Sequence, residues 1–180
     1  HMLPLLFDDS GRDLKLMSYP GYSVHVCVLR PKSTGTVTIT SADPFAAPDI
    51  DYNFFADPDD SRVMVDGIRQ ARRILAAKAF DDYRGEEMHP GADCQTDEEI
   101  IEKVKDKVGL VYHPVGTCKM GTDSVAVVDP QLRVHGLEGL RVVDASIMPR
   151  LISGNTNAPT VAIAEKASDM ILEQAAVLDN

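Results

Sequence analysis

The stretch VYHPVGTCKMG, residues 111–121, decides how the rest of this sequence of 180 residues is interpreted. Its histidine, His113, follows an apolar segment that we expect to be a strand, and it precedes Pro114, which restricts the preceding residue to extended geometry. Gly116 and Gly121 allow tight turns. A histidine held in place suits general-base chemistry because its ordinary pKa lies near neutrality. A lone His-Pro pair more often contains a histidine that is buried in the core and hydrogen-bonded, with no catalytic role.

A second candidate segment is ISGNTNAPT, residues 152–160. Gly154 either adopts a positive φ or allows a close approach by another group. Asn155 offers a donor and an acceptor just before a predicted helix, and Asn157 is its expected N-cap. The free amides of that helix start, together with Thr160, form an end that favours negative charge. A plain loop followed by a cap is the alternative.

A third candidate segment, LRVVDAS, covers residues 140–146. A short apolar strand is expected to end at Asp144, before the small residues Ala145 and Ser146. A ligand lying over a strand end would fit this arrangement, and so would a simple turn.

Working outward, alternating valines and then threonines across residues 22–40 predict a β-hairpin closed by the polar loop PKSTG. Residues 43–53 are expected to be extended and irregular, and 125–129 to be β-like. The spacing of apolar residues predicts a helix from Asp57, as N-cap, to about residue 79. Its three arginines are expected to form a solvated face: Arg69, Arg72 and Arg73.

Two further helices are predicted. Thr96 and Glu99 match a capping box, and the helix that they begin is expected to end at Gly109. The final helix should run from about residue 158 to 175. Small and apolar residues at helical spacing predict its buried face, namely Val161, Ala164, Ala167 and Ile171.

Composition narrows the classes of function. Lys and Arg total 18 against 28 Asp and Glu, a net charge of −10, so nucleic acid is not an expected partner. A hydrophobic content of 44% is typical of a folded domain, and we expect no transmembrane segment. The odd set of cysteines favours a reducing compartment over a disulfide framework: Cys27, Cys94 and Cys118.

A metal site is the alternative from another class. His89 with Cys94 and His113 with Cys118 supply two nitrogen and two sulfur ligands, a set that suits zinc. Neither pair has the usual zinc-finger spacing, so we expect no metal. A non-catalytic binding domain is the other alternative.

Several ordered motifs together resemble one known family. The strings are VYHPVGTCKMG, VVDPQLRVHGLEGLRVVDASIMP and SGNTNAPTVAIAEKASDMI, preceded by RPKSTGTVTI and PDIDYNFF. They resemble the C-terminal part of the glucose-methanol-choline (GMC) family of FAD-dependent oxidoreductases, most closely its branch of choline dehydrogenases and primary alcohol dehydrogenases. The resemblance covers nearly the whole chain from Tyr22 onward.

The resemblance implies roles for particular residues. His113 falls on the family's catalytic histidine, and Asn155 on its second active-site position. The resemblance implies oxidation of a primary alcohol to the aldehyde, with hydride passing to flavin N5. Backbone near the flavin is implied for two stretches of residues, namely Asp144 and Ala145, and Asn157, Ala158, Pro159 and Thr160.

The family's GxGxxG fingerprint is absent from these residues. We therefore expect a C-terminal fragment of α+β class, without the N-terminal Rossmann-type half. Residues 1–21 would be a tag remnant and an irregular lead-in. Residues 22–106 would belong to the substrate-domain antiparallel sheet with covering helices, and residues 107–180 to the catalytic motif and the strand-helix portion of the FAD domain.

Expectations about partners follow from the same resemblance. The complete protein would take FAD and a small alcohol, either choline or an aliphatic alcohol. Its electron acceptor is not identified by the sequence, with a quinone or the respiratory chain favoured. We expect the fragment alone to be inactive and not to retain FAD. A cytoplasmic location is expected, with peripheral membrane association as an alternative.

Overall fold

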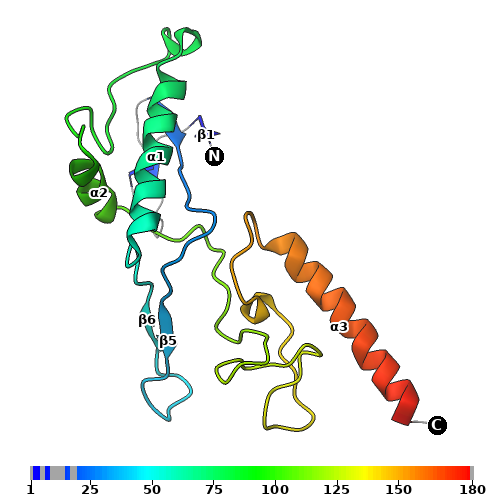
Figure 1. The fold of residues 1–180 in the computed structure, drawn as a ribbon. Helices are drawn as coiled ribbons and strands as arrows, with labels where there is room; N and C mark the ends of the chain where they lie inside the picture. The colour runs from blue at the N-terminus through cyan, green and yellow to red at the C-terminus, as the bar shows by residue number, and fades with distance from the viewer. Residues whose placement is uncertain (1, 5–6, 9–14, 17–19, 179–180) are drawn as a thin grey trace. The chain divides into compact units, whose positions relative to one another are not determined.

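A computed structural model describes residues 2–4, 7–8, 15–16 and 20–178 of the chain (Figure 1). The chain divides into two compact units. The first, called unit 1 below, comprises residues 1–35 and 51–109. The second, called unit 2, comprises residues 36–50 and 110–180.

Helix α1 of unit 1 spans Pro58–Leu75 and begins as predicted. The Asp57 side chain accepts a hydrogen bond from the amide of Asp59, and Pro58 occupies the first turn, where no intrahelical donor is needed. The helix ends at Leu75 rather than near residue 79. A separate 3-10 turn, η1 (Lys78–Phe80), follows it.

Helix α2 (Asp97–Lys105) starts with the capping box that the sequence predicts. The Thr96 hydroxyl accepts from the Glu99 amide at 3.2 Å, and the Glu99 carboxylate accepts from the Thr96 amide at 2.9 Å. These two bonds satisfy amides that have no partner inside the helix. The helix ends at Lys105, four residues before the expected Gly109, with Asp106 as its C-cap.

The core of unit 1 lies between these two helices. Ile100 is fully buried on α2, and α1 contributes Met64, Val65 and Ile68. Gly67 on α1 allows a close approach, because a Cβ there would stand 2.4 Å from Cγ1 of Val26. The buried members of this core are Met64, Val65, Ile68, Cys94, Ile100 and Val104.

The predicted arginine face of α1 is only partly correct. Arg69 and Arg73 are exposed, but Arg72 is half-buried and holds the loop that leads to α2. Its Nη2 lies 2.7 Å from the Glu87 carboxylate, and the same side chain also donates to the carbonyls of Gly91 and Cys94. Arg72 therefore links α1 to three residues of the loop before α2.

The strands of the described residues are short and form three two-stranded sheets. The hairpin predicted for residues 22–40 is wrong, because its two halves pair with other segments. β4 pairs antiparallel with β1, and β5 pairs with β6. A third pair, β2 with β3, lies in the expected irregular lead-in. The strands are β1 (Met2–Leu3), β2 (Phe7–Asp8), β3 (Lys15–Leu16), β4 (Ser23–Val24), β5 (Thr36–Thr38) and β6 (Asp49–Asp51).

Unit 2 consists largely of loops, a 3-10 turn η2 (Ala145–Ile147) and the long helix α3 (Asn157–Leu178). The β-like runs predicted at residues 125–129 and 140–144 form only isolated bridges. In the first run Val128 pairs with both Met120 and Val134, and in the second Arg141 pairs with Arg133. The core of unit 2 contains the buried residues Val128, Leu132, Ile147 and Ala167.

The predicted buried face of α3 is wrong for three of its four residues. Only Ala167 is buried, at 1% exposed, whereas Val161 is 53% and Ile171 43% exposed. Ile163 packs against the core instead, so the buried face of α3 is rotated about the helix axis from the predicted one. Asn157 is also the first helical residue rather than the N-cap, and the residue directly before the helix is Thr156.

Candidate active site

The backbone at His113 is held by an unusual conformation rather than by a strand. The expected approach strand is absent from the described residues, and Tyr112 has a φ of 60°, a left-handed conformation that costs free energy for a residue with a Cβ. Pro114 fixes the geometry on the other side. His113 itself is half-buried.

The segment after His113 turns back at Gly116, which has a φ of 92°. A Cβ at this position would stand 3.4 Å from the carbonyl oxygen of Met148. Beyond it, the amide of Cys118 donates to the Ser146 carbonyl at 3.0 Å. The amide of Met120 donates to the Ile147 carbonyl at 2.8 Å. These backbone bonds hold the HPVG loop beside η2.

Asp144 is the N-cap of η2, and its exposed carboxylate accepts from the Ser146 amide at 2.7 Å. Ala145 follows and is half-buried. Neither residue is buried, and the bonds from the Cys118 and Met120 amides hold η2 against the segment that follows His113.

The start of α3 is the third part of the site. Asn155 is exposed and directly precedes Thr156, which is buried at 7% exposed. Gly154 does not have a positive φ, so the first of its two predicted roles is not realised, and the space where its Cβ would lie is open. A group from elsewhere could approach the backbone at this point.

One contact joins the first two candidate segments. Nδ1 of His113 lies 2.8 Å from the Thr156 hydroxyl, and the Thr156 amide donates to the same nitrogen at 3.4 Å. The ring is therefore anchored one residue from Asn155, although 43 positions of sequence separate His113 from Thr156. Sequence reasoning did not single out Thr156. The usable signal was a threonine directly before a helix, where such a residue often caps.

The remaining predicted cofactor residues form the first turn of α3. Asn157 and Ala158 are exposed, and Pro159 and Thr160 are half-buried. The Thr160 hydroxyl donates to the Thr156 carbonyl at 2.6 Å, so its proton is used inside the helix while its oxygen can still accept. The early amides of a helix of 22 residues attract negative charge.

The four residues of the zinc alternative are divided between the two units. His89 and Cys94 lie in unit 1, whereas His113 and Cys118 lie in unit 2. Across the described residues there is no group of three or more His, Cys, Asp or Glu side chains that could hold a metal ion. The three cysteines are free thiols.

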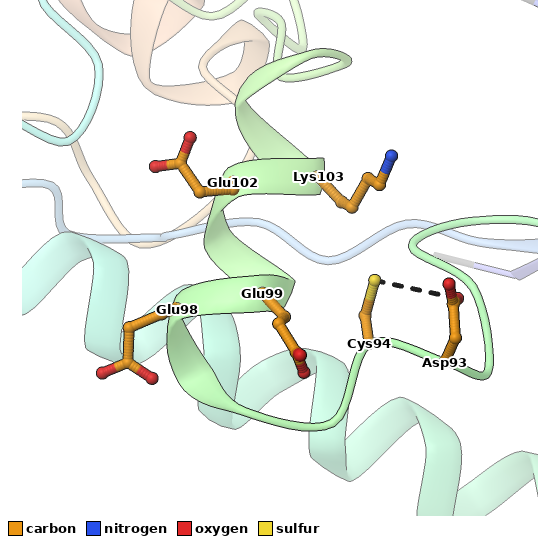
Figure 2. A pocket seen from close by; sticks show the side chains of 6 residues that line it. All are labelled: Asp93, Cys94, Glu98, Glu99, Glu102 and Lys103. Atoms are coloured by element: carbon orange, nitrogen blue, oxygen red, sulfur yellow. Dashed lines mark hydrogen bonds between the residues drawn. The ribbon is translucent and has the colours of Figure 1, made fainter.

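An open hollow of about 450 Å³ lies on unit 1 beside α2 (Figure 2). Burial raises the pKa of the Cys94 thiol, which approaches the Asp93 carboxylate at 3.9 Å. A thiol kept protonated in this way is a poor nucleophile. The hollow is lined by Asp93, Cys94, Glu98, Glu99, Glu102 and Lys103.

The family model that matches the chain is that of GMC oxidoreductases, in its C-terminal part, over residues 31–164. That match covers more than half of the sequence and places the chain among the oxidoreductases. The chain belongs to the glucose-methanol-choline (GMC) oxidoreductase family. Its α+β architecture of three helices and small sheets, within the described residues, agrees with that assignment.

Two curated relatives carry names from the expected branch. An alcohol dehydrogenase [acceptor] of Pseudomonas putida is 45% identical over 97% of this chain and 31% of its own length. An oxygen-dependent choline dehydrogenase of Paraburkholderia xenovorans is 48% identical over 95% of this chain and 30% of its own length. The chain thus spans about a third of the length of the curated relatives it matches.

A solved structure also matches the fold. A formate oxidase from Aspergillus oryzae, studied for modification of its FAD, superposes with a TM-score of 0.77 at 36% identity. The match covers 82% of this chain and 26% of that protein. Structural neighbours in this family are FAD enzymes, which supports FAD as the family's cofactor.

Within the described residues, no helix is long and apolar enough to cross a bilayer.

Proposed function

We propose that the chain is the C-terminal part of a flavin-dependent dehydrogenase that oxidises a primary alcohol to the aldehyde. The observation that carries the proposal is the bond between His113 and Thr156. It anchors an imidazole one residue along the chain from Asn155, at the start of a long helix. The names of the relatives, an alcohol dehydrogenase and a choline dehydrogenase, support the reaction class.

His113 is the proposed catalytic residue. Its imidazole either takes the hydroxyl proton of the alcohol or stabilises the alkoxide as that proton leaves. The exposed amide of Asn155 would hydrogen-bond the same oxygen and orient the carbon that loses hydride. A group that only orients the substrate still contributes, because a fixed geometry removes part of the entropic barrier.

The chain's own residues fit a flavin at this position. The start of α3 presents early amides beside exposed Asn157 and Ala158, and the backbone above Gly154 is open. η2 contributes the backbone of Asp144, which is exposed, and of Ala145, which is half-buried. A bound FAD would supply the acceptor of the two electrons that leave the alcohol as hydride. The positive end of α3 would favour the negative charge that then accumulates.

Replacing the imidazole tests the assignment in the complete protein loaded with FAD. His113→Ala should lower kcat by about 10²–10⁴-fold, because general acid-base groups contribute on that scale, while the flavin absorbance stays. His135→Ala is the matched control, since His135 is exposed and its ring bonds to the Gly121 carbonyl. Near-normal turnover of His113→Ala would falsify the role proposed for His113.

The substrate is proposed at the level of a primary alcohol. Choline would need an aromatic or acidic surface for its quaternary ammonium, and this sequence has no Trp and five Tyr. A panel of choline and uncharged aliphatic alcohols at equal concentrations separates the two substrate classes by kcat/KM. A protein that oxidises only compounds without a primary hydroxyl would contradict the proposed reaction.

A further inference from the structure

The contact between His113 and Thr156 has a direction that the chemistry of its groups determines. The Thr156 hydroxyl lies 2.8 Å from Nδ1, and the Thr156 backbone amide donates to the same nitrogen at 3.4 Å. A hydroxyl can donate or accept, but a backbone N–H only donates. Nδ1 is therefore the acceptor, and the hydroxyl is its second and shorter donor.

The opposite arrangement would be unfavourable. A proton on Nδ1 would face the amide proton of Thr156, and that amide would lose its acceptor. Thr156 is only 7% exposed, so water could not readily replace the lost bond. The neutral ring therefore has one favourable form, in which Nδ1 is bare and Nε2 carries the proton.

The two donors are themselves held in place. The Thr156 carbonyl accepts from the Thr160 amide at 3.0 Å and from the Thr160 hydroxyl at 2.6 Å. Thr156 is thereby tied to the first turn of α3. A helix of 22 residues is a rigid support, so its start presents the hydroxyl and the amide to His113 at a constant position.

We propose that Thr156 is a positioning residue that keeps the neutral imidazole of His113 in the tautomer with its proton on Nε2. The consequence for catalysis rests on the proposed function. In that tautomer Nε2 offers the alcohol oxygen a hydrogen-bond donor. Of the two roles given above, the contact favours stabilisation of the alkoxide. The Nε2–H bond stays intact and its hydrogen bond strengthens as negative charge grows on the oxygen, while the hydroxyl proton passes to water, the base that this step then requires.

The tautomer is measured directly by NMR. The 180-residue chain is labelled with ¹⁵N-histidine, and a long-range ¹H–¹⁵N spectrum is recorded at a pH where imidazoles are neutral. The His113 signals are those absent from the His113→Gln spectrum. We expect an unprotonated Nδ1 and a protonated Nε2. A protonated Nδ1, or an even mixture of tautomers, would overturn the proposal.

Two variants of Thr156 separate the effect of its hydroxyl on the tautomer from the effect of its side-chain volume. Thr156→Val keeps the volume and removes the shorter of the two donors, so only the amide at 3.4 Å remains and the His113 signals should move toward a mixture of tautomers. Thr156→Ser restores a hydroxyl and should return them to the wild-type pattern. An unchanged tautomer in Thr156→Val, or no recovery in Thr156→Ser, would show that the hydroxyl does not position the ring.

Kinetics of the complete protein test the consequence. Thr156→Val should lower kcat by roughly 10–100-fold, by analogy with the loss of a partner that orients a metal-binding histidine, with little change in KM. Thr156→Ser should recover most of it. A complete protein that oxidises no alcohol would defeat the proposed function and leave the measured tautomer standing. A wrong tautomer in an active enzyme would defeat only the inference about Thr156.

Discussion

Units 1 and 2 are stabilised in different ways. In unit 1, two helices bury apolar residues around Ile100, which is 0% exposed, and the side chain of Arg72 holds the adjoining loop. In unit 2, backbone bonds organise the loops around η2, and α3 leaves Val161 and Ile171 exposed. An apolar pattern predicts which residues are suited to burial, but burial also requires a partner. In unit 1 those partners lie on neighbouring helices, whereas two of the four positions predicted to be buried on α3 are more than 40% exposed.

The largest expected effect contrasts one isoleucine from each unit. Ile100→Ala should lower the free energy of unfolding by about 2–5 kcal/mol, because it leaves a cavity in the core of unit 1. Ile171→Ala makes the same chemical change on the exposed face of α3 and should cost less than about 0.5 kcal/mol. Urea unfolding of the two variants measures both values. Equal losses would show that the face of α3 is covered in solution and would remove the contrast.

A smaller effect is expected at the polar link of unit 1. Arg72→Met removes the partner of Glu87 and the donor to the Gly91 and Cys94 carbonyls. With side-chain exposures of 22% and 31%, the pair lies between an exposed and a buried ion pair, so we expect a loss of about 1–2 kcal/mol.

Arg73→Met is the matched control for that change, since Arg73 is exposed on the same helix. Hydrogen exchange should show the Arg72→Met loss first in the loop before α2. If both variants cost the same, the stability of unit 1 does not depend on this link.

The smallest effect is a pH dependence that both units should share. Burial alone would raise the pKa of Asp60, but hydrogen bonds from the Ser33 hydroxyl and from the Lys32 and Ser33 amides outweigh it and hold the pKa below its ordinary value of 3.8. A lowered pKa in the folded state means that the ionised form stabilises the fold above pH 3.8. That stabilisation is lost as the pH falls through the folded pKa.

Asp129 has the corresponding role in unit 2. Burial opposes ionisation there too, but hydrogen bonds from Arg133 and the Gln131 amide lower its pKa. Urea midpoints of the wild type, Asp60→Asn and Asp129→Asn between pH 7 and 3 should converge at the acid end. A wild-type advantage that persists unchanged at pH 3 would contradict the lowered pKa of that carboxylate.

Local signals in the sequence account for what could be predicted. Asp57 and the Thr96–Glu99 pair act within one helical turn, so both helix starts were found from neighbouring residues alone. The partners of β4 and β5 depend on distant segments, and an alternating pattern does not identify them. For the same reason the buried face of α3 was misplaced.

The candidate site shows the same division. The segments around His113 and Asn155 were found from motifs, and the roles of those residues stay predictions. The left-handed backbone of Tyr112 and the contact with Thr156 were not predicted, because both depend on how remote parts of unit 2 pack. A motif identifies the chemical groups, and only the fold shows which atoms of those groups meet.

Gly67 has a consequence for anyone who would engineer α1. Replacing a mid-helix glycine with alanine is ordinarily a stabilising choice, worth up to about 1 kcal/mol. Here the added methyl would collide with a branched valine that has little rotational freedom of its own. The best helix former is therefore the wrong choice at this position, and consensus-style stabilisation of α1 should leave Gly67 in place for Val26.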